Sequence, residues 1–185
     1  MSIVISSEGL ERANKLLAHI KGAFPRAVAS ASNRTLEGMR TDAVRETKER
    51  YFAKPSDIRK TLTLKKASAN NLQGAMVSRG SRKSLADYQI TPRTPKKGIN
   101  GLQGAVKRDG GLKPLKGAFL LKRGNGYKPY VRTGHGKWAV EYLISPAIPQ
   151  ILKNEETVKI IEQKASERFE KRLDHEVMRL LNLLP

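Results

Sequence analysis

Apolar positions recur every three or four residues at both ends of the chain, whereas in the middle they alternate with polar positions. The N-terminal spacing predicts a helix that begins at Ser6 or Ser7 and ends near Lys21, followed by a longer helix from Pro25 to about Tyr51. Ala and Ser are frequent in the buried stripe of this second helix, which suits the close approach of another helix. We interpret it either as an arm that packs on a neighbouring subunit or as an amphipathic helix that lies across the sheet of its own chain.

The last part of the chain predicts one long helix. Asn154 is placed to cap it, and Glu155 and Glu156 lie in the first turn, where the helix dipole favours negative charge. Its apolar stripe consists of Ile161, Ala165, Phe169, Leu173, Val177, Leu180 and Leu184. A stripe with this period suits packing across a sheet or a coiled contact between subunits.

The alternating middle of the chain predicts strands joined by turns. After a short helical turn from Pro55 to Lys60, the expected strands span residues 61–67, 72–78, 102–107, 117–122, 127–132 and 138–144. Asn125-Gly126 is a strong hairpin signal, because a type I′ turn needs positive φ at both of its central residues. Residues 79–101 are rich in Gly, Ser, Pro, Lys and Arg, and they predict a long basic loop that a partner orders and that holds at best an edge strand.

Together these elements predict an α+β fold. We expect two N-terminal helices, a central antiparallel β-sheet of about five or six strands with long basic loops, and a long C-terminal helix packed on that sheet. The 185 residues are enough for one domain with a real core. Within it we expect a helical arm (1–53), a basic β region (54–152) and the C-terminal helix (153–185).

The positive charge is concentrated in the middle of the chain. The net charge is +19, and residues 79–137 hold 15 of the 36 Lys and Arg residues but only 2 of the 17 Asp and Glu residues. This favours a polyanionic partner, nucleic acid or an acidic protein surface, although a solvated basic face that only aids solubility has the same composition. The candidate contacts are Arg93, Lys96, Lys97, Lys122, Arg123, Lys128 and Arg132. Aromatic residues near this charge either stack on bases or belong to a core or interface: Tyr88, Tyr127, Tyr130 and Trp138.

The residue types that catalysis and cofactor binding need are missing or scattered. The chain has no cysteine, and its three histidines have no partners at metal-ligand spacing. Because no phosphate-binding loop or dinucleotide fingerprint is present, we expect no cofactor, no metal and no enzymatic activity. The enzymatic alternative is a nuclease with His135 as general base, but only Asp87 and Asp109 are acids of that region. No segment approaches the roughly 18 apolar residues of a membrane span, so we expect a soluble protein made in the cytoplasm.

Five short segments form an ordered set along most of the chain. They are Tyr51–Leu64 (YFAKPSDIRKTLTL), Lys116–Phe119 (KGAF), Tyr130–Arg132, Glu141–Ile151 (EYLISPAIPQI) and Arg168–Leu173 (RFEKRL). This set resembles the minor tail protein Z family of long-tailed phages and prophages. The resemblance implies a structural protein of the virion tail that acts in tail completion at the head-proximal end.

The resemblance also implies partners. It implies assembly with tail tube, terminator and connector proteins as a ring-forming or tail-capping homo-oligomer, with host cytoplasm as the place of assembly. A subunit that lines a DNA channel needs positive charge without base-specific readout, because phosphate contacts are independent of sequence. The alternative function is that of a free cytoplasmic protein that binds nucleic acid non-specifically.

Overall fold

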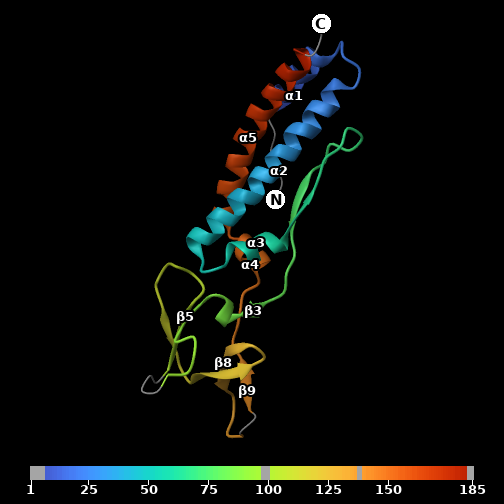
Figure 1. Ribbon diagram of the computed structural model, residues 1–185. Coiled ribbons are helices and arrows are strands. Elements are labelled where there is room, and N and C mark those ends of the chain that lie inside the picture. The colour runs from blue at the N-terminus through green and yellow to red at the C-terminus, as the bar shows by residue number, and fades with distance from the viewer. Residues whose placement is uncertain (1–6, 97–100, 137–138, 183–185) are drawn as a thin grey trace.

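The protein is an elongated α+β molecule with long helices at one end and most of its strands at the other (Figure 1). The computed structural model describes residues 7–96, 101–136 and 139–182. The long helices are α1 (Ser7–Leu17), α2 (Ala23–Arg50) and α5 (Glu155–Leu181). Two short helices, α3 (Pro55–Thr61) and α4 (Ile148–Leu152), lie where the helical body meets the strands (Figure 1). The predicted α+β class is confirmed.

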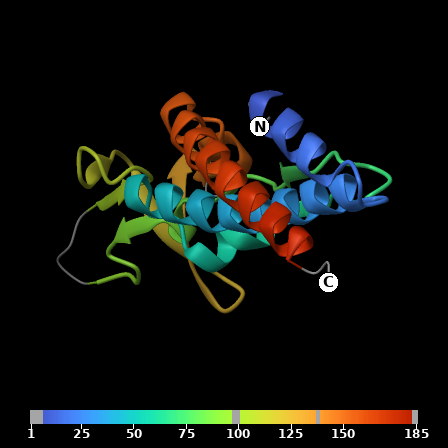
Figure 2. The same ribbon diagram turned by 90° about the horizontal axis from the view of Figure 1, so that it is seen from above.

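Helices α2 and α5 run antiparallel and form the centre of the helical body. Figure 2 shows α5 lying across α2, with α1 beside them. As predicted, Asn154 caps α5, because its Oδ1 accepts a hydrogen bond from the Thr157 N–H at 3.3 Å. Ala27 and Ala31 of α2 are completely buried in one cluster with Phe169 of α5. The small residues of α2 therefore contact a helix of the same chain, which neither interpretation of the sequence anticipated.

Two buried acids of α2 form ion pairs with partly exposed cations of α5. Asp42 of α2 has a side chain only 3% exposed, and its carboxylate lies 2.7 Å from Nη2 of Arg45 and 2.8 Å from Nη2 of Arg168. One turn further along α2, Glu46 lies 2.6 Å from Nζ of Lys164. Buried charges are tolerated only when they are paired. These pairs therefore hold α2 and α5 in one register.

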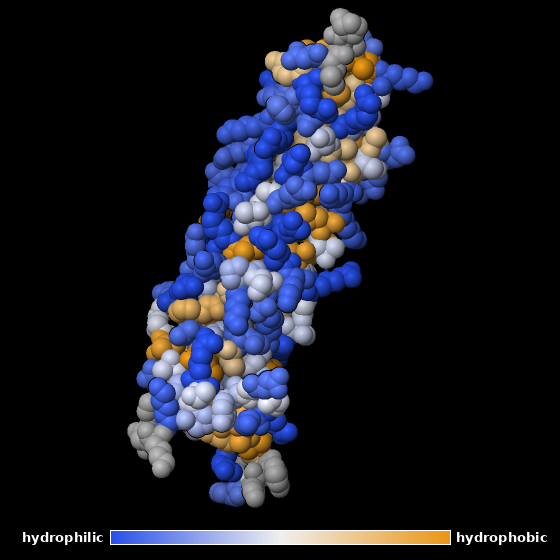
Figure 3. All heavy atoms as spheres, in the orientation of Figure 1, coloured by the Kyte–Doolittle hydropathy of each residue, from blue (hydrophilic) through white to orange (hydrophobic). Residues whose placement is uncertain are grey.

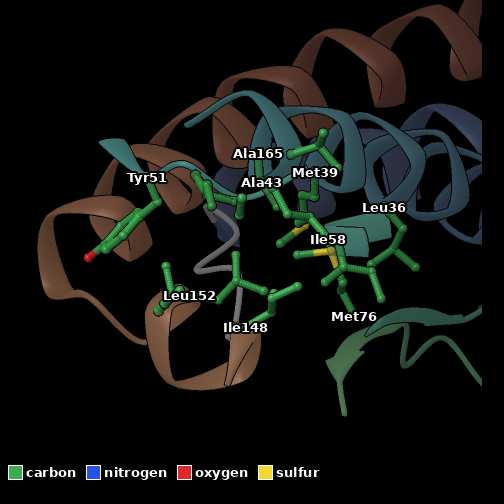
Figure 4. Close-up of a cluster of buried hydrophobic side chains, with 14 of the residues drawn as sticks. Leu36, Met39, Ala43, Tyr51, Ile58, Met76, Ile148, Leu152 and Ala165 are labelled. Atoms are coloured by element: carbon green, nitrogen blue, oxygen red, sulfur yellow. The ribbon is translucent and has the colours of Figure 1, made fainter. Parts of the chain in front are cut away.

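Two apolar clusters form the core. One joins the end of α2 to α3, α4 and the first strands, and Figure 4 shows Met39, Ile58 and Ile148 at its centre. The other lies between α1, α2 and α5, and it includes Leu17 and Phe169. The core therefore sits in the helical body and at its junction with the strands.

In the described part of the chain the strands form four small antiparallel sheets. The strands are β1 (Leu62–Lys65), β2 (Ala75–Ser78), β3 (Lys83–Ser84), β4 (Gln89–Thr91), β5 (Leu102–Ala105), β6 (Lys113–Leu115), β7 (Ala118–Arg123), β8 (Gly126–Arg132), β9 (Val140–Tyr142) and β10 (Ile144–Ser145). Their orders are β1-β2, β10-β3, β4-β5-β6 and β7-β8-β9. The strands expected in one central sheet are thus divided, and α5 packs along α2 instead of on such a sheet. Gly80, Pro92, Gly134 and Pro146 lie one or two residues after β2, β4, β8 and β10, where the chain leaves each of these strands.

The β7–β8 hairpin turns one residue earlier than predicted. Arg123 pairs with Gly126, so its two-residue turn is Gly124-Asn125. Gly124 has φ of 57°, and no described residue other than glycine has a positive φ. The predicted type I′ turn at Asn125-Gly126 is therefore wrong, and the φ values match a type II′ turn, with glycine at the first central position.

The expected loop after β2 is more structured than predicted. It contains β3, the 3-10 helix η1 (Leu85–Asp87) and β4, and Tyr88 and Ile90 are only 3% and 2% exposed. β4 is an edge strand, as expected. The sequence did not predict β6, because Pro114 at its centre argues against a strand, and an edge strand is where proline is tolerated. Trp138, at the start of the last predicted strand, lies outside the described residues.

Candidate functional site

The candidate site is one face of the sheet formed by β7, β8 and β9. Side chains alternate between the two faces of a strand, so the pairing register decides which residues share a face. Phe119 of β7 pairs with Tyr130 of β8, which pairs with Tyr142 of β9. These three rings therefore form a row across the sheet. The face that they share, here called the aromatic–basic face, carries the side chains of Phe119, Leu121, Arg123, Lys128, Tyr130, Arg132, Val140 and Tyr142.

Cations lie over the rings of this face. Nζ of Lys128 is 5.6 Å from the centroid of the Tyr142 ring, and Cζ of Arg132 is 5.4 Å from that of Phe119. The rings of Tyr130 and Tyr142 have centroids 5.2 Å apart and are tilted by 45°. Exposed cation–π contacts contribute only about 0.5–1 kcal/mol. A ligand that binds the ring or the cation more strongly can therefore displace them.

The charge on this face is uncompensated. Arg123, Lys128 and Arg132 are exposed, and none of them forms an ion pair within the described residues. The cations of the helical body differ, because Arg168 and Lys164 are bound to buried acids. Positive charge on the aromatic–basic face is therefore available to a partner.

The opposite face of the same sheet is committed to the fold. It carries Pro129, which is fully buried, and Ala118, which is 8% exposed. The carbonyl oxygen of Pro129 accepts a hydrogen bond from the Leu143 N–H at 3.0 Å, and the Leu143 carbonyl accepts one from the Leu85 N–H of η1 at 3.1 Å. On the aromatic–basic side Arg123, Lys128 and Arg132 are exposed, and the rings of Phe119, Tyr130 and Tyr142 are half-buried. Figure 3 shows apolar surface among charged side chains at this end of the molecule.

The structure brings together only part of the predicted contact set. Arg123, Lys128 and Arg132 share the aromatic–basic face, whereas Lys122 lies on the opposite face, because it is the neighbour of Arg123 in the strand. Arg93 and Lys96 are exposed and follow β4 in another sheet, and Lys97 lies outside the described residues.

The aromatic residues that the sequence placed near the basic region do not all lie on the aromatic–basic face. Tyr130 is on the aromatic–basic face, but Tyr127 is on the opposite one. Tyr88 is a core residue whose hydroxyl donates a hydrogen bond to the Pro146 carbonyl oxygen at 3.0 Å, and burial raises its pKa. Sequence reasoning missed Phe119 and Tyr142, although the alternation of Lys128, Tyr130 and Arg132 in one strand was a signal that rings and cations share a face.

Other kinds of site find little support in the described residues. No group of three or more His, Asp or Glu side chains there is arranged to hold a metal ion, and no helix there is both long and apolar enough to cross a membrane. His135 is exposed in the bend at Gly134–Gly136 that follows β8. It has no hydrogen-bond partner within the described residues that could orient it as a general base.

A comparison with known families identifies the chain. The family model of prophage minor tail protein Z matches residues 8–184, nearly the whole chain. The chain belongs to the prophage minor tail protein Z family. No curated protein and no solved structure gave a significant match.

Family membership assigns this minor tail protein Z to a structural class. The family consists of phage tail proteins, so this member is a viral structural protein located in the virion tail, where it interacts with other tail proteins. The aromatic–basic face lies within the matched residues. It is therefore part of the minor tail protein Z sequence and not an appended segment.

Proposed function

We propose that this protein acts in tail completion at the head-proximal end of the phage tail. The family match over residues 8–184 carries the proposal, because it covers the helical body as well as the β region. In this role the protein has no enzymatic activity. It assembles in the host cytoplasm as a homo-oligomer or ring, in contact with the tail tube, terminator and connector proteins.

We further propose that the aromatic–basic face contacts DNA in the completed tail. Its three cations lack acidic partners among the described residues, so phosphates can bind them without breaking an ion pair. Phosphate contacts are independent of base sequence, which suits a protein that meets whatever DNA segment lies in the tail. The row of rings supports nucleic acid over an acidic protein surface, since bases also offer flat faces for stacking.

Electron microscopy of labelled particles tests the tail role. The protein is tagged, expressed from the phage or prophage genome, and located with gold on purified particles. We expect label at the head-proximal end of the tail. The matched control is a tagged tail tube protein, which should be labelled along the whole tail. Particles without label, with the protein found in nucleic-acid-bound cytosolic fractions, would refute the proposal in favour of a free nucleic-acid-binding protein.

A further inference from the structure

We propose that the aromatic–basic face binds single-stranded DNA, with bases stacked on its rings and phosphates held by its cations. The inference rests on the DNA contact proposed above for this face and specifies the strand state of the ligand. Three observations carry it: the row of half-buried rings, the cations that flank the row, and the exposure of those cations on one face of the sheet.

The ring row has the dimensions of a stacking platform. Phe119, Tyr130 and Tyr142 are direct cross-strand partners on three adjacent strands. Because neighbouring strands lie about 4.8 Å apart, the row is about 10 Å long. Sheet faces with rings in such an arrangement stack two or three unpaired bases in known RNA-binding modules.

Cations flank the row on both sides. Lys128 and Arg132 lie two residues before and two residues after Tyr130 in β8, so each is about 7 Å from it along the strand. The backbone of a nucleic-acid strand whose bases cover the rings passes close to these side chains. In the free protein Lys128 and Arg132 lie over Tyr142 and Phe119. A base that stacks on one of these rings displaces the cation, which is then free to bind a phosphate. Base stacking and phosphate binding therefore occur together.

A duplex is a poorer match to this face. Its bases are stacked on one another, and only their edges are exposed in the grooves. A duplex would therefore engage Arg123, Lys128 and Arg132 but would leave the rings against sugars and phosphates. An acidic protein would likewise use the cations alone. Only an unpaired strand uses rings and cations at once, which is why single-stranded DNA is the occupant that this face favours.

Fluorescence anisotropy with the purified full-length protein tests the inference. The probes are a labelled oligo-dT strand and a labelled duplex of the same length, each titrated at several NaCl concentrations. We expect tighter binding to oligo-dT. Tyr130→Leu and Tyr142→Leu should each weaken it by roughly 5- to 150-fold without changing the salt dependence. Tyr130→Phe keeps the ring and should restore wild-type binding.

The charge variants have a different signature. Lys128→Ala and Arg132→Ala should each reduce the slope of log K against log salt by about 0.7, the value for one phosphate contact to a single strand. Lys122→Ala is the matched control, because its side chain lies on the opposite face, and it should change neither affinity nor slope. Circular dichroism melts establish that every variant is folded.

Several outcomes would overturn the inference. Equal or tighter binding to the duplex is one, and oligo-dT binding that survives both Tyr→Leu changes is another. Capture of poly-glutamate in place of DNA would assign the face to an acidic protein partner instead. These results leave the tail role intact if gold label is found at the head-proximal end. Absence of label from particles would remove the tail role without altering the measured strand preference.

Discussion

A single methyl group at Gly38 tests how the helical body is held together. In a helix interior, replacing glycine by alanine stabilises by about 1 kcal/mol. In this protein, however, a Cβ at position 38 would lie 2.3 Å from Nη1 and 2.7 Å from Cδ of Arg168. Arg168 must then move away, and its ion pair with Asp42, now at 2.8 Å, is lost. The Gly38→Ala variant therefore has two opposite effects on stability: a gain from higher helix propensity and a loss from the broken ion pair of buried Asp42.

The structure indicates which effect is larger. Removing one partner of a buried ion pair costs roughly 3–5 kcal/mol. The cost here is smaller, because Arg45 remains 2.7 Å from Asp42 and because the Arg168 side chain is 31% exposed. We take about half of that range, ~2 kcal/mol. After subtraction of the propensity gain, Gly38→Ala should destabilise by about 1 kcal/mol, which for a chain of this size lowers Tm by roughly 2–4 °C.

Urea denaturation of four proteins checks this reasoning: wild type, Gly38→Ala, Arg168→Ala and the double variant. Without Arg168 the new Cβ meets no guanidinium group. In that background Gly38→Ala should stabilise by about 1 kcal/mol, so the sign of its effect reverses. Stabilisation by Gly38→Ala in both backgrounds would show that the Arg168–Asp42 pair does not hold α2 on α5.

Three further changes test other contacts. Tyr88→Phe removes the hydroxyl that donates to the Pro146 carbonyl, and Asn154→Ala removes the cap of α5. Each should lower the free energy of unfolding in urea by about 1 kcal/mol. Burial raises the pKa of Glu176, but hydrogen bonds, one of them from Arg179 at 2.9 Å, outweigh it, so the pKa lies below its ordinary value of 4.5. Ionised Glu176 thus stabilises the fold above pH 4.5, and this contribution is lost as pH falls through the lower folded-state pKa. The Tm deficit of Glu176→Gln at neutral pH should therefore vanish in acid.

Each of these predictions has its own control. Tyr127→Phe removes a hydroxyl that has no hydrogen-bond partner among the described residues, so its stability should equal that of wild type. Asn154→Ser keeps a side-chain cap and should restore most of the loss caused by alanine. A Tm difference for Glu176→Gln that stays constant from neutral to acid pH would contradict the assignment of its depressed pKa.

The three long helices and α3 were predictable from the sequence within a few residues, whereas α4 (Ile148–Leu152) was not predicted. Helix α2 was expected over 25–51 and spans Ala23–Arg50, and α5 begins directly after its predicted cap at Asn154. The reason is that helix spacing, caps and breaking residues are local signals. What the helices contact was not local. The small residues of α2 predicted that another helix packs closely against it, but only the folded chain shows that this helix is α5.

The site was predictable in composition but not in arrangement. The basic region and its tyrosines were visible in the sequence. Lys122 and Arg123 are neighbours in β7 and so lie on opposite faces, but only the register shows that Arg123 is the one that shares a face with Lys128 and Arg132. Phe119 and Tyr142 joined the site only through their pairing with Tyr130. Alternation assigns faces within one strand, whereas sharing a face across strands depends on the pairing register, and a slip of that register by one residue moves every side chain of a strand to the other face.

Local chemistry therefore determined the helices, the α+β class, the excess of positive charge and the family resemblance, because each depends on residue type and short spacing. Long-range pairing decided the rest: four small sheets in place of one, a helix partner for α2, and a row of rings between two cations. Loop closure and register link residues that are far apart in the chain, and no local pattern carries that information.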